Sequence, residues 1–219
     1  MLSAIIVAAG SSRRMGFDKL MAPLAGDPVL EHTTNAFLQS PDVAEVILVC
    51  PEERFNQLDL LENGTLIKRV DGGSDRHNSV ANGLATLDQG SSFVAVHDGA
   101  RPLISQTQIR ATLDAAEEYK AATSARRVTE TVKRADANQY ISEAVDRENL
   151  WLMETPQIFD KQLLLKAYRN VEETNTLVTD EVSALQLIGI KTYLVPNPTP
   201  NLKITFPEDL ALAELLLSH

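Results

Sequence analysis

Short apolar runs alternate with segments of helical periodicity along the first half of the chain. Runs of Ile, Val and Leu with few polar interruptions are typical of strands that are buried on both faces of a parallel sheet. Such runs predict strands at residues 2–7, 43–50, 65–70 and 92–96, and the apolar spacing between them predicts helices at 29–38 and 80–87. A repeated order of strand, helix and strand indicates βαβ units, so the pattern predicts an α/β fold with a mostly parallel sheet.

The second half of the chain continues this alternation with less regular spacing. Helices are predicted at residues 104–119, 161–169 and 207–217, the first beginning near Ser105 and the last opened by Pro207. Strands are predicted at 121–125, 191–195 and 201–205. Thr179, which two acidic residues follow, is a typical helix N-cap, and capping explains it without any function.

A polar hairpin interrupts the α/β pattern. Polar and apolar residues alternate over 128–135 and 141–145, on either side of the turn-like cluster 136–139. These strands are too polar to lie in a core, and a two-stranded arm is marginally stable alone. We therefore expect a β-arm at about residues 127–147 that packs on a partner, and a second copy of the chain in a homodimer is the simplest partner.

The composition limits the classes of protein that fit. With 219 residues, of which 44% are hydrophobic and 23% charged, the chain is expected to form a single domain over residues 1–219. The apolar run at 4–9 is too short for a membrane span and no basic segment precedes it, so neither a signal peptide nor a membrane anchor is expected. The single cysteine, Cys50, excludes an intrachain disulfide and favours a cytoplasmic location. A net charge of −10 argues against broad nucleic-acid binding.

Residues 8–19 form the first candidate site, because small residues and three cations follow the first predicted strand. The small residues allow the backbone to approach a ligand closely, and Arg13, Arg14 and Lys19 supply positive charge for phosphoryl oxygens. The glycine spacing does not match a Walker A loop, and the dinucleotide-binding glycine pattern is missing. The segment is thus either a phosphate-binding loop or a surface turn with solvated basic residues.

Two further glycine-containing loops follow predicted strands. Residues 71–79 carry two adjacent glycines and place Arg76 and Ser79 on one face of a helix's first turn, while the loop after 92–96 carries Asp98 and Arg101. Each loop also has an explanation without a ligand. Residues 71–79 are typical of a glycine turn with a helix cap, and Asp98 and Arg101 are typical of a structural ion pair. Ligands bind outside the carboxyl ends of strands in open α/β sheets, so three polar loops at corresponding strand ends together favour a ligand site.

Nucleophilic and His/Cys metal chemistry do not fit the residues present. The four histidines are scattered, His97 is more typical of a hydrogen-bonded packing residue than of a base, and no serine lies in a nucleophile elbow. Metal-ligand spacing of the His/Cys kind is also absent from the sequence. Cations on glycine loops without an evident base fit phosphoryl or nucleotidyl transfer, because that reaction depends on positioning and on neutralising negative charge.

Eight motifs together resemble the 2-C-methyl-D-erythritol 4-phosphate cytidylyltransferase family, from residue 3 to about residue 215 and in the family's order. These motifs lie at residues 8–19, 71–79, 97–102, 131–134, 146–147, 155–157, 179–181 and 201–205. The resemblance implies a Rossmann-like nucleotidyltransferase fold and a homodimer built through the β-arm. It also implies that CTP reacts with methylerythritol phosphate to give the CDP-alcohol and pyrophosphate, a step of the non-mevalonate isoprenoid pathway, with Mg²⁺ as the divalent cation and with unknown metal ligands.

The resemblance further implies roles for individual residues. Arg14 and Lys19 would be catalytic, holding the triphosphate and stabilising the pentacoordinate α-phosphorus. The nucleotide would be bound, largely through backbone groups, by Ala8, Ala9, Gly10, Gly73, Ser79 and Gly99. The polyol phosphate would be surrounded by Asp98, Arg101, Thr155, Thr179 and Lys203, joined by Thr131 and Arg147 from the other subunit's arm. No general base is needed, because the attacking phosphate is already an anion.

The chain departs from the family's pattern at several positions, and other activities stay open. Asp18 and Leu20 flank Lys19 where the family usually has Pro and Gln, Gly99 replaces a common alanine, and Ser74 stands where an acidic residue is frequent. The close alternative is a cytidylyltransferase for another polyol phosphate such as ribitol 5-phosphate, because the CTP motifs are shared. A second alternative is a non-catalytic nucleotide-binding regulator, and the presence of both catalytic cations counts against it.

Overall fold

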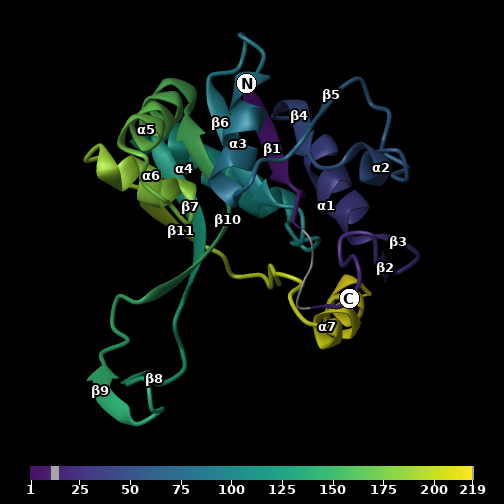
Figure 1. Cartoon of the computed structure of the whole chain (residues 1–219). Coiled ribbons are helices and arrows are strands. Elements are labelled where there is room, and N and C mark those ends of the chain that lie inside the picture. Colours follow the sequence, from purple (N-terminus) through teal and green to yellow (C-terminus); the bar gives the residue numbers. More distant parts are fainter. Residues whose placement is uncertain (11–14, 219) are drawn as a thin grey trace.

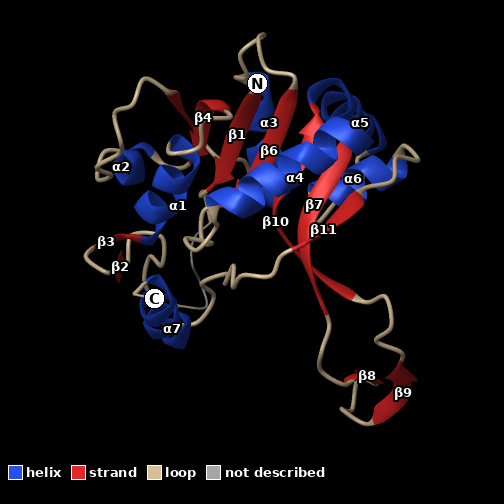
Figure 2. Ribbon diagram, turned by 180° about the vertical axis from the view of Figure 1, so that it is seen from behind, coloured by secondary structure: helices blue, strands red, loops and turns tan. Residues whose placement is uncertain are grey.

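A computed structural model describes residues 1–10 and 15–218 of the chain. Its centre is a seven-stranded sheet in the order β11-β7-β10-β6-β1-β4-β5, with helices on both faces (Figure 1, Figure 2). The strands of this sheet are β1 (Leu2–Val7), β4 (Val43–Val49), β5 (Leu66–Val70), β6 (Phe93–Asp98), β7 (Ala121–Arg127), β10 (Trp151–Asp160) and β11 (Tyr193–Pro196). The helices are α1 (Val29–Leu38), α2 (Glu52–Phe55), α3 (Arg76–Ala85), α4 (Gln106–Tyr119), α5 (Lys161–Thr174), α6 (Glu181–Leu187) and α7 (Pro207–Leu217).

The apolar strand β1 lies between two parallel neighbours, β4 and β6, in the middle of the sheet. Its residues from Leu2 to Ile6 are fully buried, as a continuous apolar run predicts for a strand covered on both faces. The register places Val7 beside both Val49 and Asp98, so the carboxyl ends of the three strands lie level with one another. This edge of the sheet is where ligands bind in open α/β folds.

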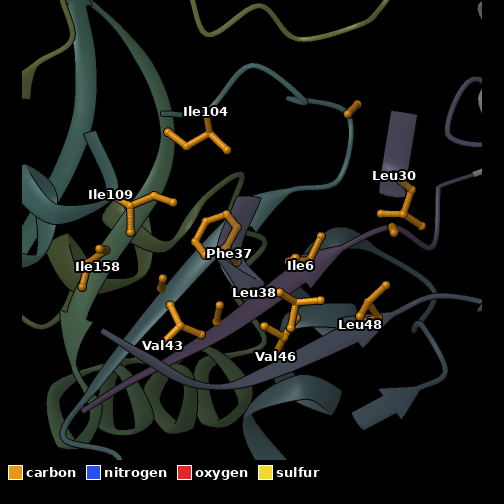
Figure 3. Packing of buried hydrophobic residues seen from close by; sticks show 14 of the residues in the cluster. Ile6, Leu30, Phe37, Leu38, Val43, Val46, Leu48, Ile104, Ile109 and Ile158 are labelled. Atoms are coloured by element: carbon orange, nitrogen blue, oxygen red, sulfur yellow. The ribbon is translucent and has the colours of Figure 1, made fainter. Parts of the chain in front are cut away.

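Two apolar clusters pack on the opposite faces of the sheet. One contains residues of α1 and α4, including Leu30, Phe37 and Ile109 (Figure 3). The other contains residues of α3, α5 and α6, including Val80 and Leu164. The pairs β1–β4, β1–β6, β4–β5 and β7–β11 are parallel, and helices cover both faces of the sheet. The mostly parallel α/β fold that the sequence predicts is therefore confirmed.

The strand β10 is the main departure from a parallel sheet. It runs antiparallel to both β6 and β7 and lies between them. Together with β7 it leaves the sheet and leads to the polar hairpin of β8 (Val132–Ala135) and β9 (Ile141–Val145), which extends away from the rest of the molecule (Figure 1). A further short hairpin, β2 (Pro23–Leu24) with β3 (Asp27–Pro28), precedes α1.

Most predicted elements are present, and three expectations need correction. Residues 201–205 form no strand, because their backbone groups bond individually to other segments. Thr179 does not cap a helix; Asp180 caps α6, its carboxylate accepting from the Ser183 N–H at 2.9 Å. The helix predicted at 80–87 already begins at Arg76. Within the described part of the chain, no helix combines the length and apolar character that crossing a bilayer would need.

Candidate active site

An open cavity of about 570 Å³ lies at the carboxyl ends of β1, β5 and β6. Three loops that the sequence singles out separately, after residues 7, 70 and 97, converge on it. The lining residues are Val7, Ala9, Gly10, Met15, Lys19, Leu20, Gly73, Ser74, Arg76, Ser79, Asp98, Gly99, Ala100, Lys203 and Thr205. The predicted convergence of the three loops is therefore present in the structure.

The loop after β1 contributes Ala9, Gly10 and Lys19 to the cavity wall. Lys19 Nζ donates to the carbonyl oxygen of Ile204 at 2.6 Å, which links the first and last parts of the chain at the cavity. Ala8 is buried and does not line the cavity, and its N–H already donates to the Val49 carbonyl at 2.9 Å. The predicted catalytic residue Arg14 lies outside the described residues.

The loop between β5 and α3 packs directly on the loop after β1. A Cβ added to Gly72 would lie 2.2 Å from the Cβ of Ala9, so only glycine permits this approach of the two backbones. The next residue, Gly73, donates its N–H to Ser79 Oγ at 3.0 Å, and that hydroxyl in turn donates to the Asp75 carbonyl at 3.1 Å. The glycine pair thus shapes the cavity by close packing of one loop on the other.

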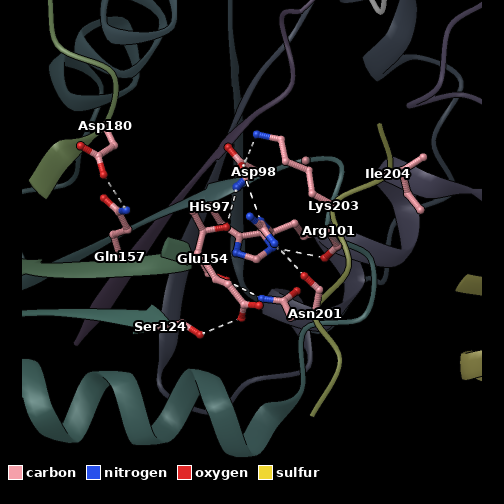
Figure 4. Close-up of polar contacts among 12 residues, drawn as sticks. His97, Asp98, Arg101, Ser124, Glu154, Gln157, Asp180, Asn201, Lys203 and Ile204 are labelled. Carbon is pink, nitrogen blue, oxygen red and sulfur yellow. Dashed lines mark hydrogen bonds and ion pairs between the residues drawn. The ribbon is translucent and has the colours of Figure 1, made fainter. Parts of the chain in front are cut away.

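Asp98, at the end of β6, is a buried carboxylate surrounded by cations. Lys203 Nζ lies 2.8 Å from Oδ2 and Arg101 Nε lies 3.4 Å from Oδ2 (Figure 4). Arg76 Nη2 lies 3.6 Å from Oδ1. Burial by itself raises the pKa of Asp98, but the three cations outweigh burial and hold that pKa well below its ordinary value. Asp98 is therefore ionised at neutral pH, and the cluster keeps a net positive charge.

Arg76 connects this cluster to α6 through a second buried carboxylate. Its guanidinium forms two hydrogen bonds to Glu181, at 2.7 and 3.0 Å, and Tyr168 donates its hydroxyl to Glu181 at 2.9 Å. Burial lowers the pKa of Arg76, but Glu181 raises it above the ordinary value, so the guanidinium keeps its charge. The two hydrogen bonds to Glu181 hold the Arg76 guanidinium in the cavity wall.

His97 is a packing residue, as its sequence context predicts. Its ring is fully buried, lies 4.9 Å from the Phe37 ring between centroids, and has Nε2 at 3.3 Å from the Arg101 carbonyl. Burial lowers the pKa of His97 to about 3, so the imidazole is neutral at pH 7. A neutral ring whose Nε2–H donates to a backbone carbonyl orients the 97–101 loop.

Thr155 and the segment 197–205 brace this loop from the other side. Thr155 Oγ1 accepts from the Asp98 N–H at 3.1 Å, and the Thr155 carbonyl accepts from Asn201 Nδ2 at 2.7 Å. Arg101 Nη1 donates to the Asn201 carbonyl at 2.7 Å (Figure 4). Residues 197–205, which we call the crossing segment, therefore bind to β10 and to the loop after β6, and their Lys203 contacts Asp98.

Several predicted site residues do not reach the cavity within one chain. Thr131 and Arg147 are exposed on the arm, far from the carboxyl edge of the sheet (Figure 1). Thr179 is exposed and does not line the cavity. Arg101 is bound to Asp98 and Asn201 behind the cavity wall rather than in it.

Sequence reasoning missed the carboxylates that hold the site's cations and loops. Glu181 pairs with Arg76, which is 105 residues away, and Glu154 accepts from Asn197 Nδ2 at 2.9 Å. A carboxylate in a polar motif carries no local signal of a partner so distant in sequence. Glu154 is buried in β10, a strand that the sequence pattern did not predict, so its position in the sheet could not be used to find it either.

The described residues fit a metal ion only if a ligand supplies most of its coordination. They contain no group of three or more His, Cys, Asp or Glu side chains that could hold a metal ion. Among them, Asp98 is the one acidic side chain that lines the cavity. Mg²⁺ is commonly bound by one or two carboxylates together with substrate phosphates and water, so this donor set fits Mg²⁺ carried by a polyphosphate.

Comparison with known proteins identifies close relatives along the whole chain. The model of the family described as 2-C-methyl-D-erythritol 4-phosphate cytidylyltransferase matches residues 2–219. A protein of that name from Caldanaerobacter subterraneus subsp. tengcongensis is 41% identical, over 99% of this chain and 98% of its own. Another from Pelotomaculum thermopropionicum is 38% identical, over 99% and 94%.

Solved structures give the same result. The crystal structure of 4-diphosphocytidyl-2C-methyl-D-erythritol synthase from Anaerococcus prevotii superposes with a TM-score of 0.87 and 31% identity, covering 100% of this chain and 96% of that one. The structure of 2-C-methyl-D-erythritol 4-phosphate cytidylyltransferase from Thermus thermophilus gives a TM-score of 0.82 and 30% identity, with both chains fully covered.

Proposed function

Because the chain belongs to the 2-C-methyl-D-erythritol 4-phosphate cytidylyltransferase family, we propose that its cavity binds CTP and 2-C-methyl-D-erythritol 4-phosphate and joins them. The products are 4-diphosphocytidyl-2-C-methyl-D-erythritol and pyrophosphate, in the non-mevalonate route to isoprenoids. The observation that carries the proposal is the arrangement of Lys19, Arg76 and Lys203 around one cavity at the carboxyl edge of the sheet. Such a site suits two phosphorylated substrates.

The chemistry needs positioning more than proton transfer. A phosphate oxygen of the acceptor attacks the α-phosphorus of CTP, and the new P–O bond forms as the bond to the bridging oxygen of the β-phosphate breaks. Pyrophosphate leaves with that oxygen. The attacking group is already an anion, which agrees with a cavity beside which the buried His97, next to Asp98, is neutral.

Lys19 and Arg14 are proposed to stabilise the charge that develops at the α-phosphorus and on the departing pyrophosphate. Lys19 is supported by its place in the cavity wall, whereas Arg14 is supported by the sequence motif alone. Ala9, Gly10, Gly73, Ser79 and Gly99 are proposed to bind the nucleotide, supported by the way the glycine loops line one side of the cavity. Ala8 would act through its neighbours, since its own N–H is bonded to Val49.

Asp98 and Lys203 are proposed to bind the acceptor, with Arg101 and Thr155 holding Asp98 in place. Asp98 accepts from Lys203 Nζ at 2.8 Å, and in the proposed complex a polyol hydroxyl shares the carboxylate while the ammonium turns toward the acceptor phosphate. We propose Mg²⁺ as the divalent cation, held by Asp98 and phosphate oxygens. When bound, it would neutralise triphosphate charge.

The polar arm is proposed to build a homodimer. Tyr140 and Ile141 at its end are 73% and 70% exposed, and a partner that covers them would remove two large apolar side chains from water. In the dimer, Thr131 and Arg147 of the partner subunit would complete the acceptor side of the cavity. Thr179 is a candidate contact from the same chain at that opening. A cytoplasmic location and the absence of nucleic-acid or membrane partners stay predictions.

Pyrophosphate release with CTP and a panel of acceptors tests this proposal. We expect release with 2-C-methyl-D-erythritol 4-phosphate and little with ribitol 5-phosphate, and a Lys19→Ala protein purified in the same way controls for contaminating activity. Release with ribitol 5-phosphate alone would replace the proposed acceptor. Calorimetric binding of CTP without any pyrophosphate release would instead indicate a nucleotide-binding regulator.

A further inference from the structure

The guanidinium of Arg54 joins two segments that border the cavity, although Arg54 itself does not line it. Arg54 lies in the short helix α2, just after the carboxyl end of β4. Its Nε and Nη2 donate to Asp18 Oδ2 at 3.0 and 2.7 Å, and its Nη1 donates to the carbonyl oxygen of Ala8. One side chain therefore binds both the residue that leaves β1 and the residue that precedes Lys19.

The Asp18 carboxylate extends this contact around Lys19. Its Oδ2 accepts from Arg54, while its Oδ1 accepts from the N–H of Leu20 at 3.1 Å, and its backbone carbonyl accepts from Met21 at 3.2 Å. The two carboxylate oxygens thus hold the chain before and after Lys19. This Asx-type turn fixes the backbone from which the Lys19 side chain extends into the cavity.

The burial of the pair distinguishes it from an ordinary surface ion pair. The side chain of Arg54 is 10% exposed and that of Asp18 is 38% exposed. Exposed ion pairs usually contribute little to stability, but a guanidinium that is enclosed and makes three hydrogen bonds restrains its partners. Ala8 is restrained from both sides, because its N–H is bonded to Val49 and its carbonyl to Arg54.

We infer that Arg54 and Asp18 form a clamp that positions Lys19 for the triphosphate of CTP, an inference that rests on the proposed function of the cavity. Both are positioning residues: they act through the Lys19 backbone and touch no substrate. Lys19 approaches its target only if its main chain is held, since a displacement of about 1 Å in a positioned group can lower a rate about 10²-fold.

The test compares Arg54→Met and Asp18→Asn in the wild-type and Lys19→Ala backgrounds, with kcat and KM measured from pyrophosphate release. We expect each variant to lower kcat about 10-fold in the wild-type background, with the KM for the acceptor unchanged. In the Lys19→Ala background the same substitutions should change kcat less than about 2-fold, because the group they position is already gone. An undiminished loss of kcat in the Lys19→Ala background would overturn the clamp, as would an unchanged kcat in the wild-type background.

One control variant and the choice of two test variants keep the result interpretable. Arg110→Met removes an arginine–aspartate pair of 2.7 Å between Arg110 and Asp42, away from the cavity, and should leave kcat unchanged. Asp18→Asn keeps the Arg54 contact to Ala8, so it tests the clamp even if Arg54→Met fails to fold.

Calorimetric titration with CTP and Mg²⁺ separates failure of the clamp from failure of the proposed function. Both clamp variants should weaken CTP binding several-fold in the wild-type background and leave it unchanged in the Lys19→Ala background. If the wild-type protein binds CTP but transfers nothing, the proposed function fails and this titration still decides the clamp. Equal weakening in both backgrounds would overturn it.

Discussion

Replacing His97 by Gln should make the stability of the protein less sensitive to acid. The imidazole is fully buried, and burial lowers its pKa to about 3 in the folded chain, against an ordinary pKa of 6.5 in an unfolded one. As the pH falls below 6.5, the unfolded chain binds a proton that the folded protein does not bind. The free energy of unfolding therefore falls with decreasing pH, and the loss is complete only near pH 3.

The magnitude follows from the width of that pH window. Each pH unit in which only the unfolded state is protonated costs about 1.4 kcal/mol of stability. Between pH 8 and pH 5 the wild-type protein should thus lose about 2 kcal/mol through His97 alone. Gln does not titrate, and its side-chain amide can still donate to the Arg101 carbonyl that His97 contacts.

Urea unfolding at pH 8 and pH 5, followed by far-UV circular dichroism, measures this effect. The free energy of unfolding of His97→Gln minus that of wild type should be larger at pH 5 than at pH 8 by about 2 kcal/mol. Phe37→Leu is the matched control, because it removes the ring packed on His97 and keeps the imidazole, so its loss of stability should be similar at both pH values. Equal acid sensitivity of His97→Gln and wild type would refute the reasoning.

Three other outcomes are expected. Lys19→Ala should lower kcat about 10² to 10³-fold in the pyrophosphate-release assay with little change in Tm, as for loss of one donor to a transition state; a near-normal kcat would contradict its role. Gly72→Ala should force apart the loops that meet at Ala9 and reduce both Tm and CTP affinity, whereas Gly90→Ala, whose added Cβ meets nothing closer than 3.5 Å, should not. A 1:1 mixture of inactive Lys19→Ala and Arg147→Ala subunits should recover about a quarter of wild-type activity if the site is shared between subunits; no recovery after verified subunit exchange would exclude the shared site.

The sequence predicted the parallel half of the fold well because its signals are local. Continuous apolar runs such as Leu2–Val7 correspond to strands buried on both faces, and the polar loops that follow them meet at one edge as parallel topology requires. The strand β10 was not predicted, since its apolar residues near the arm, Leu152 and Met153, are exposed while the polar residues Glu154, Thr155 and Gln157 are buried in the sheet. Its place between β6 and β7 depends on pairing with segments far away in the sequence.

The same distinction separates the predicted and unpredicted parts of the site. Ala9, Gly73 and Asp98 belong to loops with a recognisable composition, and all three line the cavity. Glu181 and Arg54 act on residues 105 and 36 positions away, respectively, so no local pattern marks them. Residues 201–205 look like a strand, yet they bond to separate partners in the 98–101 loop and β10, and tertiary contacts outweigh the local preference there.

The crossing segment determines when the site can first exist during protein synthesis. The chain emerges from the ribosome beginning at its N-terminus, and β1, β4 and β6 can pair before residues 197–205 are translated. Lys19 and Asp98 gain their contacts with Ile204 and Lys203 only after the crossing segment has been translated. A nascent chain stalled before residue 203 would hold a nearly complete sheet but a site without the Lys203 charge beside Asp98 and without the Ile204 carbonyl that binds Lys19.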